Sequence, residues 1–362
     1  MEILVGAARE PPRPFVTKAR TLRRTRRTTR VLVCFVLTLL PGCRRSPDRA
    51  DGGSAMTVRI AVGGQNQLIY LPTTLARELG FYREEGLEVE LQDHAGGAKA
   101  LQAMIGGSAD VVSGFYDHTI QMAAEGRPLV AFVTMLRFPG LVLATSPQSP
   151  VTRIEDLKGR VVGVTSPGSS SHMLLTFLLH RHDVPVESVS VTGIGGAGTA
   201  IAAIERGKVD AGMLTDPAFT IVQRRAPGVR ILADLRHAEG VKDAFGTGTY
   251  PASVLYASAE WVHTRRETAA RLARAIKRTL VWLQAHTPQE IADRTPADFR
   301  GDDPGLYADA VKNTMAMFSP DGVMEADGAE AVRTLLAQSM DKVRGATIDL
   351  SKTYTNELVN GR

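Results

Sequence analysis

The chain has 362 residues with 44% apolar side chains, 43 Lys and Arg, 38 Asp and Glu, and a formal net charge of +5. That charge does not indicate nucleic-acid binding, because residues 1–43 hold nine basic and two acidic groups; subtracting their net +7 leaves −2 for residues 44–362. Both cysteines, Cys34 and Cys43, fall in the same segment, which excludes an internal disulfide or a cysteine-ligated metal site in the remaining body.

Residues 1–43 have the pattern of an export signal. Arginines up to Arg30 precede an apolar run at residues 31–40, and Gly42 and Cys43 follow it. A basic region, an apolar run of about 7–15 residues and a small residue at the cut are typical of such signals. A membrane anchor is the alternative, but this run is too short for a hydrocarbon core that needs about 20 residues.

The end of this segment resembles the bacterial lipobox, in which a lipidated cysteine becomes the first residue of the mature protein. Leu40, Gly42 and Cys43 match that box, whereas Pro41 departs from it. We expect lipidation at Cys43 and a flexible polar tether over residues 44–56. The mature protein would then be held to the membrane in the periplasm or at the cell surface.

From residue 57 onward, short β-like runs alternate with helical segments, which predicts an α/β fold with open sheets. The predicted strands are 58–62, 89–92, 109–113, 129–135, 161–164, 189–191, 209–214 and 251–256. The predicted helices are 72–79, 97–105, 117–125, 169–182, 197–205, 218–224 and 265–286. In the last helix, the 3–4 spacing of Leu272, Ile276, Leu280 and Leu283 predicts the buried face.

A helix that ends at glycine and leads through aspartate into an apolar strand occurs twice, at residues 101–111 and 202–211. This recurrence favours two related lobes. We predict lobe 1 at 57–145 and 250–362 and lobe 2 at 146–249. The chain would cross between the lobes near residues 141–146 and 247–252, which makes lobe 1 discontinuous.

At residues 70–89 the chain reads YLPTTLARELGFYREEGLEV, and IEDLKGRVVGV at 154–164 and GKVDA at 207–211 follow. These runs resemble solute-binding proteins of nitrate/sulfonate/taurine-type ABC importers, a group similar to the NMT1/THI5-like family. The resemblance implies a two-lobed periplasmic-binding-protein fold of type II. It also implies a small-molecule ligand and an ABC permease as partner. We expect a monomer.

Ligands of open α/β sheets bind beyond the carboxyl ends of the strands, where five loops of this chain offer hydroxyls, amides, rings and glycines. The candidate ligand-binding residues in these loops are Gln65, Asn66, Tyr70, Gly96, Gly97, Phe115, Tyr116, Thr165, Ser169, Ser170 and Asp216. Each also has a structural alternative: a surface turn for Gln65 and Asn66, the core for the aromatic pair, and an ordinary helix start for Asp216.

The loop at residues 165–172, TSPGSSSH, gives the sharpest prediction. A strand end followed by a helix that opens with three serines leaves free backbone N–H groups, hydroxyls and a helix dipole that favours an anion. The resemblance implies that this loop holds a nitrate-, sulfonate- or carboxylate-like group. Ordinary N-capping by one serine is the alternative.

Metal and catalytic signatures are absent from the sequence. The spacings of His94, His118 and His172 do not match HxxxH-type sites, so we predict no metal and no cofactor. The chain also lacks GxSxG, HExxH and P-loop motifs. Some relatives of this fold are enzymes of thiamine-precursor or menaquinone synthesis. The former carry a CCCFC motif that this chain lacks.

We therefore predict no enzyme but a solute-binding component of an ABC importer. An enzyme on the same fold is the rival, and a sensory ligand-binding module is a third reading. Apart from Lys99, the candidate loops hold no lysine or arginine, which argues against a multiply charged phosphate. Nitrate, a sulfonate, bicarbonate, a pyrimidine vitamin precursor and an aromatic carboxylate all stay open as ligands.

Overall fold

The computed structural model describes residues 56–301, 303–325 and 327–361. The predicted export signal, the lipidation at Cys43 and all but the end of the tether lie outside the described residues. The strands of the described part are β1 (Met56–Val62), β2 (Leu87–Asp93), β3 (Val111–Phe115), β4 (Leu129–Thr134), β5 (Leu141–Thr145), β6 (Val161–Val164), β7 (Ser190–Gly193), β8 (Ala211–Thr215), β9 (Ile231–Asp234) and β10 (Ser253–Ser258).

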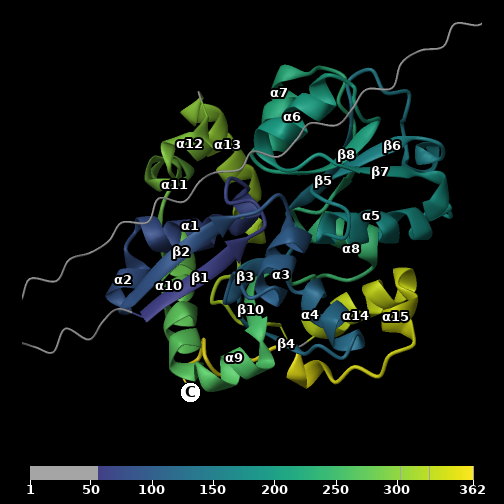
Figure 1. The fold of residues 1–362 in the computed structure, drawn as a ribbon. Helices are drawn as coiled ribbons and strands as arrows, with labels where there is room; N and C mark the ends of the chain where they lie inside the picture. The colour runs from purple at the N-terminus through teal and green to yellow at the C-terminus, as the bar shows by residue number, and fades with distance from the viewer. Residues whose placement is uncertain (1–55, 302, 326, 362) are drawn as a thin grey trace, which may run out of the picture. The chain divides into compact units, whose positions relative to one another are not determined.

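Helices flank both sheets (Figure 1). The α-helices are α1 (Leu71–Glu78), α2 (Phe81–Glu84), α3 (Gly97–Ile105), α4 (Asp117–Ala124), α5 (Ser170–Arg181), α6 (Ala197–Glu205), α7 (Ala218–Arg225), α8 (Ala238–Phe245), α9 (Ala259–Thr264), α10 (Arg266–Ala285), α11 (Pro288–Arg294), α12 (Ala297–Arg300), α13 (Pro304–Thr314), α14 (Gly328–Ser339) and α15 (Asp341–Arg344). Short 3-10 turns are η1 (Leu68–Tyr70), η2 (Ile154–Leu157), η3 (Val186–Ser188), η4 (Met315–Met317) and η5 (Leu350–Lys352).

The strands of the described chain form two sheets with the orders β2-β1-β3-β10-β4 and β7-β6-β8-β5-β9. In each sheet three neighbouring strands are parallel, and the fourth strand in the order, β10 in the first sheet and β5 in the second, runs antiparallel to both of its neighbours. We call the part built on the first sheet lobe 1 and the part built on the second lobe 2. This architecture confirms the predicted α/β class and the two-lobed fold.

The segment at residues 141–146, where the sequence predicts a crossing between the lobes, contains β5. Leu141–Thr145 is fully buried and pairs with β8 and β9 in the second sheet. The predicted end of lobe 1 at residue 145 and the predicted crossing at 141–146 are therefore placed too late. A continuous apolar run has no period by which to recognise a strand, so LVLAT was not identified as one.

The chain crosses between the sheets once after β4 and once before β10. These two crossings run side by side, because the Tyr250 N–H donates to the Arg137 carbonyl at 3.1 Å and the Ala252 N–H donates to the Leu136 carbonyl at 2.9 Å. Sheet membership places lobe 2 at residues 141–245 and returns the chain to lobe 1 at β10.

The two glycine–aspartate repeats occupy matching places in the two sheets. Asp110 precedes β3, and its Oδ2 accepts the Arg59 N–H of β1 at 2.9 Å. Asp210 precedes β8, and its Oδ2 accepts the Val161 N–H of β6 at 2.9 Å. Each carboxylate ties together the amino-terminal ends of a parallel pair, so the repeated sequence pattern reflects one repeated structural element.

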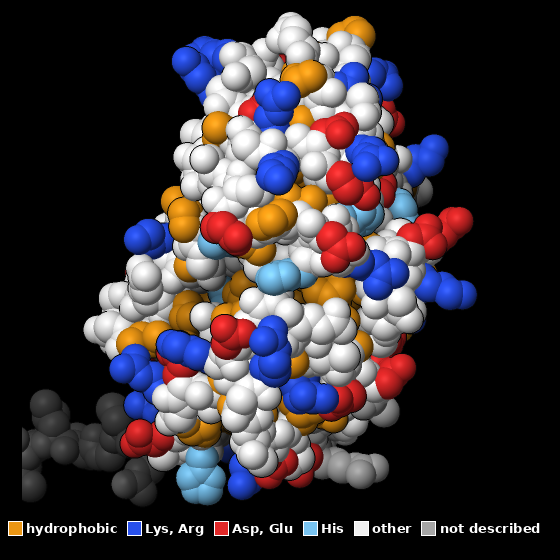
Figure 2. Space-filling view, turned by 90° about the vertical axis from the view of Figure 1, so that its right-hand side faces the viewer, with side chains coloured by type: hydrophobic (Ala, Val, Ile, Leu, Met, Phe, Trp, Pro, Cys, Tyr) orange, Lys and Arg blue, Asp and Glu red, His pale blue; other side chains and the backbone are white. Residues whose placement is uncertain are grey.

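Helix α10 is the longest helix of the described chain, and its predicted apolar face is confirmed: Leu272, Ile276, Leu280 and Leu283 are fully buried. Within the described residues, no helix has the length and apolar character needed to cross a membrane. On the face of the molecule that Figure 2 shows, basic and acidic side chains are interspersed. That face carries no broad field of one sign.

Candidate functional site

Loops at the carboxyl edges of the parallel strands in both sheets meet at one enclosed space, which we call the interlobe pocket. In this structure its water-accessible space is about 10 Å³, which is room for about one water molecule. The residues that line it are Gly63, Gln67, Ile69, Tyr70, Gly97, Phe115, Leu141, Thr165, Ser169, Ser170 and Ser171. A ligand larger than a water molecule therefore requires that the lobes move apart.

The pocket brings together part of the predicted set: Tyr70, Gly97, Phe115, Thr165, Ser169 and Ser170. Gly96 lies beside it, where a Cβ would come within 2.7 Å of the Ser166 hydroxyl of lobe 2. Only glycine permits this approach, and the backbone at Gly96 has a positive φ of 106°.

Three other predicted residues do not line the pocket. The Gln65 N–H donates to Asp93 Oδ1 at 2.7 Å, and Asn66 is half-buried. The Tyr116 hydroxyl pairs with that of Thr353 at 2.5 Å, and its ring meets Tyr354 edge-on inside lobe 1. The Gln65 side chain is buried and its Oε1 has no partner among the described residues, so it does not match the alternative of a surface turn, whereas Tyr116 lies in the core.

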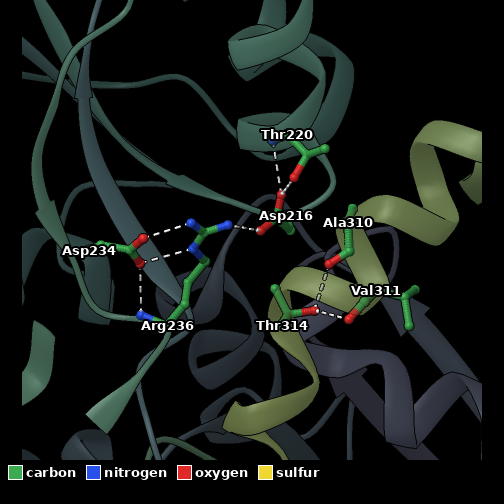
Figure 3. Close-up of polar contacts among 7 residues, drawn as sticks. All are labelled: Asp216, Thr220, Asp234, Arg236, Ala310, Val311 and Thr314. Carbon is green, nitrogen blue, oxygen red and sulfur yellow. Dashed lines mark hydrogen bonds and ion pairs between the residues drawn. The ribbon is translucent and has the colours of Figure 1, made fainter. Parts of the chain in front are cut away.

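Asp216 also lies elsewhere, in a network within lobe 2 (Figure 3). Its Oδ1 accepts the N–H and the hydroxyl of Thr220 at 2.9 and 2.7 Å. Its Oδ2 accepts Arg236 Nη1 at 3.1 Å, and Arg236 also bonds Asp234. The side chain of Asp216 is fully buried, and both of its oxygens already have partners.

Two helices from different lobes begin at the pocket. Helix α3 of lobe 1 starts at Gly97, and α5 of lobe 2 starts at Ser170. Among the described residues, the backbone N–H groups of Gly97, Ser170 and Ser171 have no hydrogen-bond acceptor. Converging N–H groups at helix starts form a site for an anion or another strong acceptor.

The serines of this loop do not cap their own helix. Ser169 stands at the N-cap of α5, yet its Oγ accepts the Ala98 N–H of α3 at 3.2 Å, across the lobes. Ser171 Oγ accepts the Thr165 N–H at 3.0 Å. The alternative of ordinary N-capping therefore does not describe this loop.

Tyr70 brings an unused hydroxyl to the pocket. Its side chain is only 3% exposed, and its hydroxyl has no hydrogen-bond partner among the described residues. Burial, assisted by the nearby Asp117, raises the pKa of this hydroxyl, so it keeps its proton and can donate it. A Cβ on Gly63 would lie 2.9 Å from this oxygen, which explains why a glycine stands there.

Asp117 and His118 open helix α4 directly behind the pocket and are both fully buried. Ser170 Oγ donates to Asp117 Oδ1 at 2.7 Å, and the Tyr250 hydroxyl donates to Oδ2 at 3.3 Å. His118 Nδ1 pairs with the Tyr256 hydroxyl at 3.0 Å, and its Nε2 has no partner among the described residues. Burial raises the pKa of Asp117 and lowers that of His118.

Gln67 is a pocket residue that the sequence prediction left out. Its Nε2 donates to the Gly63 carbonyl at 2.8 Å, and its Oε1 accepts the Thr215 hydroxyl of lobe 2 at 2.9 Å. The loop after β1 was predicted to contact the ligand, but the sequence does not show that Gln67, rather than Gln65, faces the pocket. Ile69, Leu141 and Ser171 were missed as well. Leu141 could not be found because β5 was not recognised.

A larger hollow of about 510 Å³ lies at the opposite edge of the first sheet. The end of α3, the amino-terminal ends of β3 and β4, and Trp261 surround it, with the Arg59–Asp110 ion pair in its wall. Ligands of open α/β sheets bind at the other edge. In the parts of the chain that the structure describes, no group of His, Cys, Asp and Glu is placed to hold a metal ion.

Comparison with known proteins adds three findings. A family model described as NMT1/THI5 like matches residues 69–291. A solved protein of Bordetella bronchiseptica is 38% identical, with a TM-score of 0.82 over 86% of this chain and 97% of its own. YtlA of Bacillus subtilis, named a binding protein, is 21% identical over 76% of this chain and 81% of its own length.

A fourth comparison concerns the fold alone. The alkanesulfonate-binding protein SsuA of Xanthomonas axonopodis, solved with bound MOPS, has a TM-score of 0.67 at 17% identity. The alignment covers 84% of this chain and 99% of SsuA.

Proposed function

Because the chain belongs to the NMT1/THI5-like family, we propose that it is the solute-binding component of an ABC importer. It captures a small ligand between its lobes and delivers that ligand to a permease. The observation that carries this proposal is the convergence of α3 and α5 on the interlobe pocket with the unpaired N–H groups of Gly97, Ser170 and Ser171.

The pocket's chemistry supports a ligand with one strong acceptor group. Its described lining holds no lysine or arginine, so backbone N–H groups and the Tyr70 hydroxyl supply the donors. Such donors suit a singly charged oxyanion rather than a multiply charged phosphate. The solved structures of similar fold include a nitrate-binding protein of Synechocystis besides the sulfonate-binding SsuA, which agrees with this class.

Capture requires that the lobes separate and close around the ligand. In the structure described here the lobes touch through Ser169 and Ala98, through Ser170 and Asp117, and through Gln67 and Thr215. These bonds link the loops that line the pocket, so opening would break them and expose the donors. The paired crossings at residues 135–140 and 246–252 would serve as the hinge.

We further propose that the protein works outside the cytoplasm as a monomer, held to the membrane by lipid on Cys43. This part rests on the sequence of residues 1–43. Globomycin-sensitive processing of the full chain, followed by mass spectrometry of the mature N-terminus, tests it. Release of a Cys43→Ser variant into the soluble fraction is expected.

Ligand capture is tested by thermal shift of the exported, processed protein against nitrate, bicarbonate, sulfonates, aromatic carboxylates and pyrimidine precursors. A ligand at a hundredfold excess over its Kd stabilises the native state by about 2.7 kcal/mol, which a melting curve resolves. Mass spectrometry of the same mixtures would reveal turnover. A product formed from the bound compound would favour the rival enzyme instead.

A further inference from the structure

Asp117, which lies behind the pocket, determines how the Ser170 hydroxyl is oriented in the pocket. Its oxygen lies 2.7 Å from Asp117 Oδ1, and the Ser170 hydroxyl is the donor of this hydrogen bond. The Ser170 hydroxyl therefore donates its only hydrogen to Asp117 and cannot donate it to a ligand. What it offers to the pocket is a lone pair.

The surroundings of Asp117 favour this arrangement. Besides Ser170 of α5, it meets the Tyr250 hydroxyl from the crossing before β10 and the His118 backbone N–H of its own helix, and all three donate. The other titratable groups near it are the His118 ring, Tyr70 of η1 and Tyr256 of β10. No lysine or arginine shifts its pKa; besides hydrogen bonds, the charge that lowers it is that of the neighbouring His118 ring, whose own pKa is lowered by burial.

Beside the Ser170 lone pair, the other unpaired groups of the described pocket lining have the reverse polarity. The N–H groups of Gly97, Ser170 and Ser171 and the unpaired Tyr70 hydroxyl are donors, and Tyr70 is almost fully buried while lining the pocket. A ligand that matched only these donors would leave the Ser170 lone pair without a partner inside a dry site. Unpaired buried acceptors weaken binding.

We infer that Asp117, acting through Ser170, is a specificity-determining positioning residue, and that the ligand is a small oxyanion or polar heterocycle that carries its own O–H or N–H donor. This inference rests on the function proposed above. The acceptor group of the ligand lies against the starts of α3 and α5, and its donor contacts Ser170 Oγ. Compounds of the same size and charge that lack the donor bind less well.

Matched pairs of ligands test this directly. Bicarbonate and nitrate are both planar and singly charged and differ in one O–H donor. Isethionate and ethanesulfonate are both singly charged and differ in one hydroxyl. Calorimetric titrations of the processed full chain at about pH 8 should give roughly tenfold tighter binding for the donor-bearing member of at least one pair.

Two variants separate the positioning role from a structural one. Asp117→Asn keeps the shape but can donate to Ser170, which frees the Ser170 proton for the pocket, so the preference should vanish or reverse. Ser170→Ala removes the lone pair and should abolish the preference without reversing it. Ser108→Ala, an exposed serine bonded to the Ala103 carbonyl, is the control and should keep the full preference.

The outcomes distinguish this inference from the function on which it rests. Equal affinity for both members of each pair in the wild type, or an unchanged preference in Asp117→Asn, overturns the inference alone. If neither member of either pair binds, the capture of small oxyanions fails and the inference fails with it.

Discussion

Two buried aspartates follow equivalent strands of the two lobes and have different partners. Asp117 follows β3 in lobe 1, and Asp216 follows β8 in lobe 2; each strand is the third in its sheet order. Asp216 is neutralised by Arg236 and bonded by Thr220, as Figure 3 shows. Asp117 receives only neutral donors, one of them from the other lobe. The lobes share a framework, but only one aspartate is left to act on the pocket.

The largest expected effect concerns Arg236. Arg236→Met removes the counter-charge and leaves Asp216 buried and unpaired, which should cost about 3–5 kcal/mol of unfolding free energy. Urea unfolding measures this. Asp117→Asn, the matched change in lobe 1, should cost far less, since no ion pair is broken. Equal losses would contradict the contrast between the two aspartates.

The next effect concerns the start of α5. Ser170→Pro removes the free N–H at the first helical position, where proline is tolerated, and Ser170→Ala keeps that N–H while it also removes the hydroxyl. Loss of one hydrogen bond to a charged ligand is about 1.5–3 kcal/mol, so the proline variant should bind roughly 10- to 100-fold more weakly than the alanine variant. Similar dissociation constants for the two variants in calorimetry would mean that the Ser170 N–H does not contact the ligand.

The pH dependence of stability should differ between wild type and Asp117→Asn. Burial raises the pKa of Asp117, so the folded state holds its proton at pH values where the unfolded chain has lost it. From the ordinary carboxyl pKa near 3.9 up to the raised value, the unfolding free energy attributable to Asp117 falls as pH rises. Denaturation of both proteins across this window should show a steeper decline for wild type. Parallel curves would mean that the Asp117 pKa is not raised.

The smallest effects concern the aspartates that do behave alike. Asp110→Ala and Asp210→Ala each remove one carboxylate that joins a parallel strand pair, and each should cost about 1 kcal/mol, because both side chains are partly exposed. Thermal unfolding of the two variants tests whether the repeated elements are equivalent. A large difference between them would limit the similarity of the lobes to topology.

Periodicity and strand-end rules predicted the fold class, the buried face of α10 and the loops of the pocket. They could not predict which side chain of a loop faces the ligand. Asp117, Gln67 and Asp216 all follow strands, and only the contacts across the lobes separate them. β5 was missed for another reason: its apolar run carries no alternation, and its pairing depends on strands distant in sequence.

A crystal structure of the processed protein with its tightest-binding ligand tests the central claim most directly. We predict ligand density in the interlobe pocket, with an acceptor group against the N–H groups of Gly97 and Ser170 and a donor facing Ser170 Oγ. Density in the hollow beside Trp261, or in the pocket but away from the starts of α3 and α5, would contradict this account.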